Sequence, residues 1–300
     1  MTRHPALCVG QVKEFHYFDN LLVAHKTTDN ETLRKRYEKN FRLCGRGNLT
    51  FDATPMNWIL PHLITSSYTS AELTEKKFVV VLRHPVDREY SWYNHQVRGC
   101  LASLRSKIST RDTDMVAGKT MLTNAQYTSL TDKNSLTGRK ICALVLRNET
   151  ELIPFEKTTP DSILLKNIKS FAEYSSDVNM LRGDSLYHWN ILQWLRFIDR
   201  SQLLIFNFEH VSQNSSDTIK RISEFFGIDH LWADTRKNPG VISSILPGTV
   251  LDCKSADRLN AYFDKQNKDL LTLVNDDDKK PRSEPTLVNF KAEYKCRNNN

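Results

Sequence analysis

The 300-residue sequence contains no apolar run close to the length of about 18 residues that a membrane-spanning helix needs. It also lacks a signal-peptide pattern, an internal repeat and the C-x-x-C pairs that are typical of structural zinc sites. The six cysteines lie far apart, without histidines at the spacing that zinc binding requires. These absences exclude a transmembrane helix within these residues, a repeat protein and the common zinc modules, so we expect no metal.

The charge balance points to an anionic partner. The chain has 42 Lys and Arg against 35 Asp and Glu, which gives a net charge of +7 and a pI near 9.0. This balance suits a nucleotide, a sulfated or uronic glycan, or nucleic acid, and charge alone does not choose among them. With 39% hydrophobic residues, the chain is long enough for one large α/β domain with a substantial core.

Hydrophobic patterning predicts alternating strands and helices. The β-branched run 78–82 is typical of a buried central parallel strand, a second strand is predicted at 202–208, and a shorter one at 49–51. Apolar residues recur at helical spacing in three later stretches and predict helices with one face in the core: these are Tyr187, Ile191, Trp194 and Ile198; Ile219, Ile222, Phe225 and Phe226; and Leu259, Tyr262, Phe263 and Leu270. The pattern favours a three-layer α/β fold with a central parallel sheet, in which ligands bind at the carboxyl ends of the strands.

The composition along the sequence also predicts the domain organisation. Residues 1–275 are expected to form one domain, within which the Thr-, Ser- and Lys-rich stretch 101–159 is a possible insertion or lid. Residues 276–300, which begin with three successive aspartates, are expected to form a solvated C-terminal tail.

The segment that follows the first predicted strand has the composition of a phosphate site. Arg83 stands at the carboxyl end of the strand, and Pro85 favours the start of a helix near Val86. Ser91 lies about five residues into that helix, or roughly 7.5 Å along its axis. A guanidinium at the strand end and a hydroxyl on the helix can converge on one phosphate, where the helix N-terminus adds positive potential.

This segment resembles the 3′-phosphate-binding motif of sulfotransferases, R-x-P-x-x-R-x-Y/F-S-x-Y/F, and meets each of its fixed positions. The resemblance implies a P-loop-NTPase-like sulfotransferase fold and the donor 3′-phosphoadenosine 5′-phosphosulfate (PAPS). It also implies that Arg83 and Ser91 hold the 3′-phosphate of this donor.

A second segment, residues 13–19, resembles the K-E-x-H-F/Y-F-D pattern of heparan sulfate and related Golgi carbohydrate sulfotransferases. The resemblance implies that Glu14 is the general base that takes the proton from an acceptor hydroxyl, while Lys13 and His16 contact the acceptor. A sugar hydroxyl is a poor nucleophile until a base accepts its proton, an effect that usually contributes about 10²–10⁴-fold to the rate.

Three further segments match the same family in order. Residues 51–55 resemble the G-E-A/K-S/T-P segment that lines the acceptor cleft, with Asp52 in place of the glutamate. Tyr187 lies in the counterpart of the G-x-Y helix at the donor site. Arg236 and Lys237 occupy the place of the late basic loop that closes over the nucleotide. The resemblance thus implies that Asp52 contacts the substrate and the other three residues contact the donor.

The resemblance also implies that the segment that binds the 5′-phosphosulfate of the donor is missing from this sequence. The family opens with a strand and a Lys-x-Gly-Thr-Ser/Thr loop around the 5′-phosphosulfate, and the sequence has no such loop. We therefore expect an N-terminally truncated enzyme that binds the donor poorly and turns over slowly or not at all. By resemblance, the full-length protein would be a type II membrane protein of the Golgi lumen, with its membrane anchor upstream. Six cysteines and four N-x-S/T sequons, at Asn30, Asn48, Asn148 and Asn214, are consistent with that lumen.

Two other functions compete with this one on the sequence, and only the second remains open. A nucleotide kinase of the P-loop class needs a Walker lysine and magnesium ligands, and neither pattern is present. A non-catalytic binder of an anionic glycan or nucleotide on the same scaffold suits both the basic charge and the absent donor loop. A glycan acceptor and a nucleotide donor are the expected partners, and nucleic acid is not.

Overall fold

The computed structural model describes residues 6–8, 12, 14–19, 29–45, 47–109, 171–176, 185–229, 251–275, 278, 280–290 and 296–297. The chain forms two compact units, each built from separate stretches of sequence. Unit 1 comprises Met1–Arg83, Leu186–Val241 and Lys265–Phe290, and unit 2 comprises His84–Ser185, Ile242–Asp264 and Lys291–Asn300.

Unit 1 is built around two parallel strands, β3 (Phe78–Leu82) and β4 (Leu203–Asn207). Their register pairs Phe78 with Leu203 and Leu82 with Asn207, so both strands end at the same edge. This confirms the two longer predicted strands and their parallel direction. The other elements of unit 1 are β1 (Leu7–Cys8), α2 (Asn30–Glu38), η1 (Lys39–Phe41), β2 (Leu49–Thr50), η2 (Pro55–Ile59), α3 (Pro61–Ser66), α4 (Ser70–Thr74), α9 (Tyr187–Leu195), η6 (Arg200–Gln202), α10 (Phe208–Gln213) and α11 (Ser215–Phe226).

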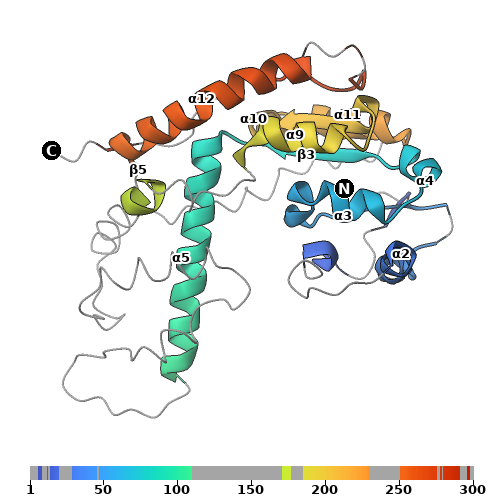
Figure 1. Ribbon diagram of the computed structural model, residues 1–300, viewed down its shortest axis with the longest axis horizontal. Helices are drawn as coiled ribbons and strands as arrows, with labels where there is room; N and C mark the ends of the chain where they lie inside the picture. The colour runs from blue at the N-terminus through green and yellow to red at the C-terminus, as the bar shows by residue number, and fades with distance from the viewer. Residues whose placement is uncertain are drawn as a thin grey trace. The chain divides into compact units, whose positions relative to one another are not determined.

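Helices pack on both faces of β4. Two of these helices, α9 and α11, are labelled near β3 in Figure 1. Leu203 and Ile205 point into one hydrophobic cluster, which includes Ile191 and Trp194 of α9. Leu204 and Phe206, which alternate with them, point into a second cluster with the apolar stripe of α11. Because the five residues of β4 are all buried, the layered α/β arrangement predicted from the sequence is present around this strand.

Strand β3 is less covered than the sequence suggested. Val79 is 37% exposed and Val81 is 48% exposed, although the continuous apolar run predicted burial on both faces. Their neighbours Phe78, Val80 and Leu82 pack on the α9 cluster, so the two valines lie on the other face of the strand. Among the described residues, the α11 cluster includes side chains of β4 but none of β3. The prediction of full burial is therefore wrong for this face.

The helical stripes are largely confirmed. The predicted core residues of the first stripe are all 6% exposed or less, although α9 ends at Leu195 and Ile198 lies beyond it. Helix α11 ends where Gly227 adopts a left-handed φ of 70°, which closes the last turn through its N–H. The third stripe lies on α12 (Cys253–Asn275), where Tyr262 is an exception because it is 39% exposed.

Residues 281–290, which the sequence analysis places in a solvated tail, belong instead to the core of unit 1. Leu287 is 2% exposed and Phe290 is 8% exposed, and both join the α9 cluster. Glu284 forms a buried ion pair with Arg200 and accepts a hydrogen bond from the backbone N–H of Ile205 at 2.8 Å. The segment therefore lies along β4.

Unit 2 contains the long helix α5 (Pro85–Ser109), the helical residues 171–176 and the short parallel pair β5 (Leu251–Asp252) and β6 (Cys296–Arg297). Helix α5 begins at Pro85, which confirms the predicted strand, turn and helix around this proline. It continues through residues 101–109 of the predicted insertion or lid, and residues 110–159 lie outside the described part. A disulfide joins Cys253 to Cys296.

Candidate active site

Glu14, His16 and Asp19 form a cluster of charged side chains in unit 1. The imidazole of His16 lies between two carboxylates, with Nδ1 at 2.7 Å from Asp19 Oδ2 and Nε2 at 3.6 Å from Glu14 Oε2. Side-chain exposure is 46% for His16, 35% for Glu14 and 16% for Asp19. Glu14, the predicted base, and His16, which is predicted to contact the acceptor substrate, therefore lie together and are open to solvent.

The hydrogen bond that the His16 ring donates to the Asp19 carboxylate is the main reason that the pKa of His16 is raised above its ordinary value. Burial of the ring opposes this shift, and the charges of Asp19, Glu14 and Asp52 add to it. A protonated His16 would place a positive charge beside the Glu14 carboxylate.

Asp52 lies at the centre of a second group of polar contacts, which includes the backbone of the Glu14 segment. Its Oδ1 accepts hydrogen bonds from the N–H of Thr54 at 2.9 Å, the hydroxyl of Thr54 at 2.7 Å and the N–H of Phe15 at 3.4 Å. Its Oδ2 accepts from Asn57 Nδ2 at 3.0 Å and the Tyr37 hydroxyl at 3.3 Å. The structure thus brings Glu14, His16 and Asp52 together, as three of the predicted site residues.

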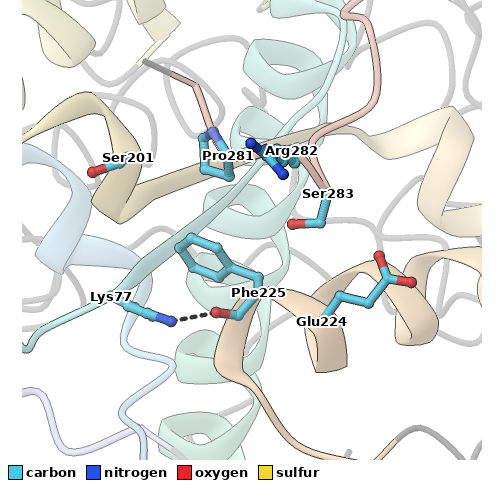
Figure 2. Close-up of a pocket in the computed structure, with 7 residues that line it drawn as sticks. All are labelled: Lys77, Ser201, Glu224, Phe225, Pro281, Arg282 and Ser283. Carbon is cyan, nitrogen blue, oxygen red and sulfur yellow. Dashed lines mark hydrogen bonds between the residues drawn. The ribbon is translucent and has the colours of Figure 1, made fainter.

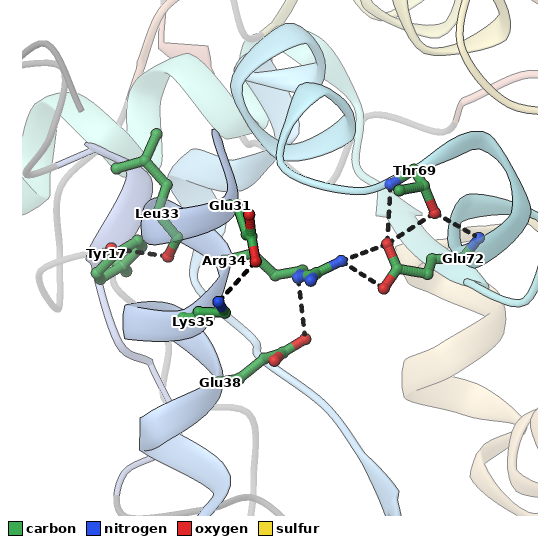
Figure 3. A network of polar contacts seen from close by, with 8 residues as sticks. All are labelled: Tyr17, Glu31, Leu33, Arg34, Lys35, Glu38, Thr69 and Glu72. Carbon is green, nitrogen blue, oxygen red and sulfur yellow. Dashed lines mark hydrogen bonds and ion pairs between the residues drawn. The ribbon is translucent and has the colours of Figure 1, made fainter. Parts of the chain in front are cut away.

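Aromatic side chains join the Glu14 segment to helix α2 and to η1. The ring of Phe15 lies edge-on to Phe41 at 4.9 Å between centroids, and the Tyr17 hydroxyl donates to the Leu33 carbonyl at 2.9 Å. On its other side α2 is joined to α4, because Arg34 pairs with both oxygens of Glu72 (Figure 3). Glu72 also closes a capping box with Thr69 at the start of α4. The Glu14 segment therefore packs on α2, which the Arg34–Glu72 ion pair joins to α4.

Arg83 follows the carboxyl end of β3, as predicted, and its guanidinium lies over the ring of Phe208 at 5.1 Å from the centroid. Phe208 is the first residue of α10 and follows the carboxyl end of the neighbouring strand β4. A cation over an aromatic face is stabilised by the ring quadrupole. The contact places the guanidinium at the sheet edge where ligands of α/β folds bind.

Ser91 lies on α5 in unit 2 and is half-buried. Two residues earlier, the fully buried Glu89 accepts hydrogen bonds from Arg88 at 3.0 Å, from the Tyr174 hydroxyl at 2.8 Å and from the Ser185 hydroxyl. These contacts fix the first turns of α5 within its own unit. Arg83 belongs to unit 1, so the joint binding of a 3′-phosphate by Arg83 and Ser91 stays a prediction.

The remaining predicted site residues divide into two groups. Tyr187 is 5% exposed and lies in the hydrophobic core, with its ring centroid 5.9 Å from that of Phe290. Its role at the donor site stays a prediction. Lys13, Arg236 and Lys237 lie outside the described residues.

A surface groove of about 340 Å³ lies elsewhere on unit 1. Lys77 precedes β3 and Ser201 precedes β4, so the groove lies at the amino ends of the strands, opposite to the end that Arg83 follows. Figure 2 shows Lys77 donating to the backbone carbonyl of Phe225, another residue that lines the groove. Its lining contains none of the predicted site residues: it consists of Lys77, Ser201, Glu224, Phe225, Pro281, Arg282 and Ser283.

The described residues contain neither a metal-binding cluster nor a membrane-spanning helix. Within this part of the chain, His, Cys, Asp and Glu side chains form no group of three or more that could hold a metal ion. No helix among the described residues has both the length and the apolar character that a membrane span requires.

Comparison with known proteins assigns the family. The model of the sulfotransferase domain family matches residues 44–280, which is most of the chain. The chain belongs to the sulfotransferase family. This confirms the predicted α/β, P-loop-like sulfotransferase fold and a transferase that moves a sulfuryl group from a donor to an acceptor. Sulfotransferases generally use PAPS as that donor.

Further comparisons add a structural relative. The crystal structure of a sulfotransferase from Alicyclobacillus acidocaldarius is similar over 91% of this sulfotransferase and 87% of the other chain, with 16% sequence identity and a TM-score of 0.46. A search of curated proteins gave no match. The family match includes Asp52, Arg83, Ser91 and Tyr187 but begins after the Glu14 segment. The Golgi carbohydrate subgroup, which depends on that segment, therefore stays a prediction.

Several residues around Glu14 are not among the predicted site residues. Asp19 belongs to the matched pattern without a predicted role, although an Asp three residues after a His can reach its ring. Thr54 follows Asp52 by two residues, the spacing at which an Asp side chain binds a backbone N–H in a turn. Tyr37 and Asn57 gave no signal, because their contacts depend on the packing of α2 and η2.

Proposed function

We propose that this sulfotransferase transfers a sulfuryl group from PAPS to a hydroxyl, or an amine, of a carbohydrate, with Glu14 as the general base. The observation that supports the proposal most directly is the position of Glu14. Its carboxylate is 35% exposed, lies 3.6 Å from the imidazole of His16, and is carried by a segment that Asp52 and helix α2 hold in place. An accessible carboxylate on a fixed segment is what proton abstraction from a sugar hydroxyl requires.

The chemistry follows from this geometry. Glu14 takes the proton of the acceptor hydroxyl while the hydroxyl oxygen forms a bond to sulfur, and the bond between sulfur and the phosphate oxygen of the donor breaks. The products are the sulfated sugar, adenosine 3′,5′-bisphosphate and a protonated Glu14, which then releases its proton to solvent. His16 lies beside this carboxylate, with its Nε2 at 3.6 Å from Glu14 Oε2.

Binding of the donor is assigned to Arg83 and Ser91, with Tyr187, Arg236 and Lys237 as further donor contacts. The position of Arg83 after the carboxyl end of β3, over the ring of Phe208, supports this assignment. A guanidinium can form charge-assisted hydrogen bonds to phosphate oxygens, each contributing about 1.5–3 kcal/mol.

We further propose that the protein works in an oxidising lumen such as that of the Golgi. The disulfides Cys8–Cys44 and Cys253–Cys296 support this location, because such bonds persist in the secretory pathway and are rare in the cytosol. An acceptor on a glycosaminoglycan or a glycoprotein glycan would be present in the same compartment.

The test compares the unchanged chain with Glu14→Gln and Arg83→Ala. Radiolabelled PAPS and a mixture of desulfated glycans would detect even slow transfer, and calorimetry with adenosine 3′,5′-bisphosphate would measure donor-site affinity. Glu14→Gln should abolish transfer and leave nucleotide affinity unchanged, whereas Arg83→Ala should lower that affinity at least about tenfold, or about 1.4 kcal/mol.

Three results would count against the proposal. Transfer by Glu14→Gln at the rate of the unchanged chain would remove Glu14 as the base. Unchanged affinity in Arg83→Ala would remove Arg83 from the donor site. Binding of nucleotide and glycan by the unchanged chain without any transfer would favour the non-catalytic alternative.

A further inference from the structure

The carboxylate of Asp52 is fully occupied by donors of the protein itself. A carboxylate has about four lone-pair sites, and five hydrogen-bond donors already point at the two oxygens of Asp52. They come from the Glu14 segment, from α2, from η2 and from the turn that Asp52 itself begins. An acceptor hydroxyl would have to displace one of them in order to bind Asp52.

Thr54 extends this network to the backbone of His16, two residues after Glu14. Its hydroxyl donates to Asp52 and accepts a hydrogen bond from the N–H of His16 at 3.1 Å. Since Asp52 also accepts from the N–H of Phe15, the two residues that follow Glu14 are both held by their backbone. Thr54 is 4% exposed, so its hydroxyl serves the protein interior and is closed to a substrate.

The backbone that this network holds has a costly conformation. His16 has a φ of 51°, in the left-handed region that residues with a Cβ atom seldom adopt. Such a conformation costs of order 1–3 kcal/mol and persists only where surrounding contacts enforce it. The hydrogen bonds to the N–H groups of Phe15 and His16 are contacts of this kind. Without them, the segment would relax and the Glu14 carboxylate would leave its place beside His16.

We infer that Asp52 and Thr54 are positioning residues, which fix the backbone of residues 15–16 and thereby aim the Glu14 carboxylate, and that Asp52 does not contact the acceptor. This inference rests on the proposed function of Glu14. It differs from the substrate-binding role that the resemblance implies for Asp52.

The decisive variant is Thr54→Val, which removes the hydroxyl and keeps the shape of the side chain. Misplacement of a catalytic group by about 1 Å can cost on the order of 100-fold in rate. We expect kcat to fall at least about tenfold, with little change in the KM for the acceptor, because only the transition state requires the aimed base. Thr54→Ser keeps the hydroxyl and should restore most of kcat.

Thr65→Val is the matched control. Thr65 is also 4% exposed, and its hydroxyl donates to the Pro61 carbonyl at 2.7 Å within α3. The variant removes a buried threonine hydroxyl of the same unit whose hydrogen bond lies within α3. It should lose stability as Thr54→Val does and should keep the kcat of the unchanged chain. Equal losses of kcat in the two variants would show a general effect of stability and overturn the inference.

Asp52→Asn gives a second test that does not depend on activity. The amide has a single oxygen, so its NH₂ group would face donors and release part of the network. Hydrogen–deuterium exchange of the peptide that contains residues 14–19 should become at least about tenfold faster, as expected when a local hydrogen-bond network is lost. Unchanged exchange would overturn the inference, as would a raised acceptor KM with normal kcat. If the unchanged chain shows no transfer, the proposed function fails, and the exchange result still decides whether Asp52 positions this segment.

Discussion

The ion pair between Arg200 and Glu284 provides the sharpest prediction about stability. The side chains are 3% and 0% exposed, and the guanidinium of Arg200 also donates to the Leu203 carbonyl. Burial is the main reason that the pKa of Glu284 is raised, while Arg200 opposes the shift. Removal of one partner leaves the other charge buried and uncompensated, which typically costs about 3–5 kcal/mol. Glu284→Gln should therefore be among the most damaging single changes in unit 1.

Urea unfolding at neutral pH would measure this loss. A typical m-value of about 2 kcal/mol per molar predicts that a loss of about 4 kcal/mol lowers the midpoint by about 2 M. The double variant Arg200→Met with Glu284→Leu should recover most of the loss, because an apolar pair of similar size replaces both charges. Glu31→Gln is the control, since it breaks an ion pair with Lys35 in which both side chains are more than 60% exposed, and its midpoint should hardly move. A midpoint for Glu284→Gln within about 0.5 M of the unchanged chain would refute the reasoning, because that shift corresponds to only about 1 kcal/mol.

Two further predictions concern the disulfides and pH. The Cys253–Cys296 bridge closes a loop with a sequence separation of 43, for which chain entropy gives about 4 kcal/mol. In the double Ser variant the free energy of unfolding should fall by that amount, which lowers the urea midpoint. An unchanged midpoint would show that the bridge contributes nothing. Because the pKa of His16 is raised above 6.5, its contact with Asp19 stabilises the fold fully below that pH and is lost as the pH rises through the raised value. Asp19→Asn should therefore differ from the unchanged chain at acidic pH and converge with it at alkaline pH, and a constant difference across the range would contradict this origin.

The sequence was sufficient where a local pattern determines the structure. The apolar run of β3 predicted its bounds, Pro85 predicted the start of α5, and the spacing of Ile191 and Trp194 predicted a helix with one buried face. Each of these signals lies within a few neighbouring residues. The short pattern from Arg83 to Tyr93 likewise led to the family that the comparison then showed, whereas the subgroup that the Glu14 pattern predicts stays a prediction.

The errors arose where partners distant in sequence decide the outcome. Composition made the C-terminal segment look solvated, but Glu284 finds Arg200 and the N–H of Ile205, while Leu287 joins the core. Apolar composition made β3 look buried on both faces, but burial of Val79 and Val81 depends on whether a helix layer extends beyond β4. In both cases the local sequence was compatible with either outcome, and contacts between distant segments selected one.

The replacement of glutamate by Asp52 shows how a departure from a family pattern can carry information about structure. An aspartate side chain is short enough to accept a hydrogen bond from the backbone N–H two residues later, and Asp52 does so with Thr54 at 2.9 Å. A glutamate, longer by one methylene, does not form this turn readily. In this chain the turn brings the Thr54 hydroxyl to the N–H of His16, so the residue that departs from the pattern also controls the backbone beside the predicted base. On this reasoning Asp52→Glu should lower kcat even though it restores the family residue, unless residues 53 and 54 are changed with it.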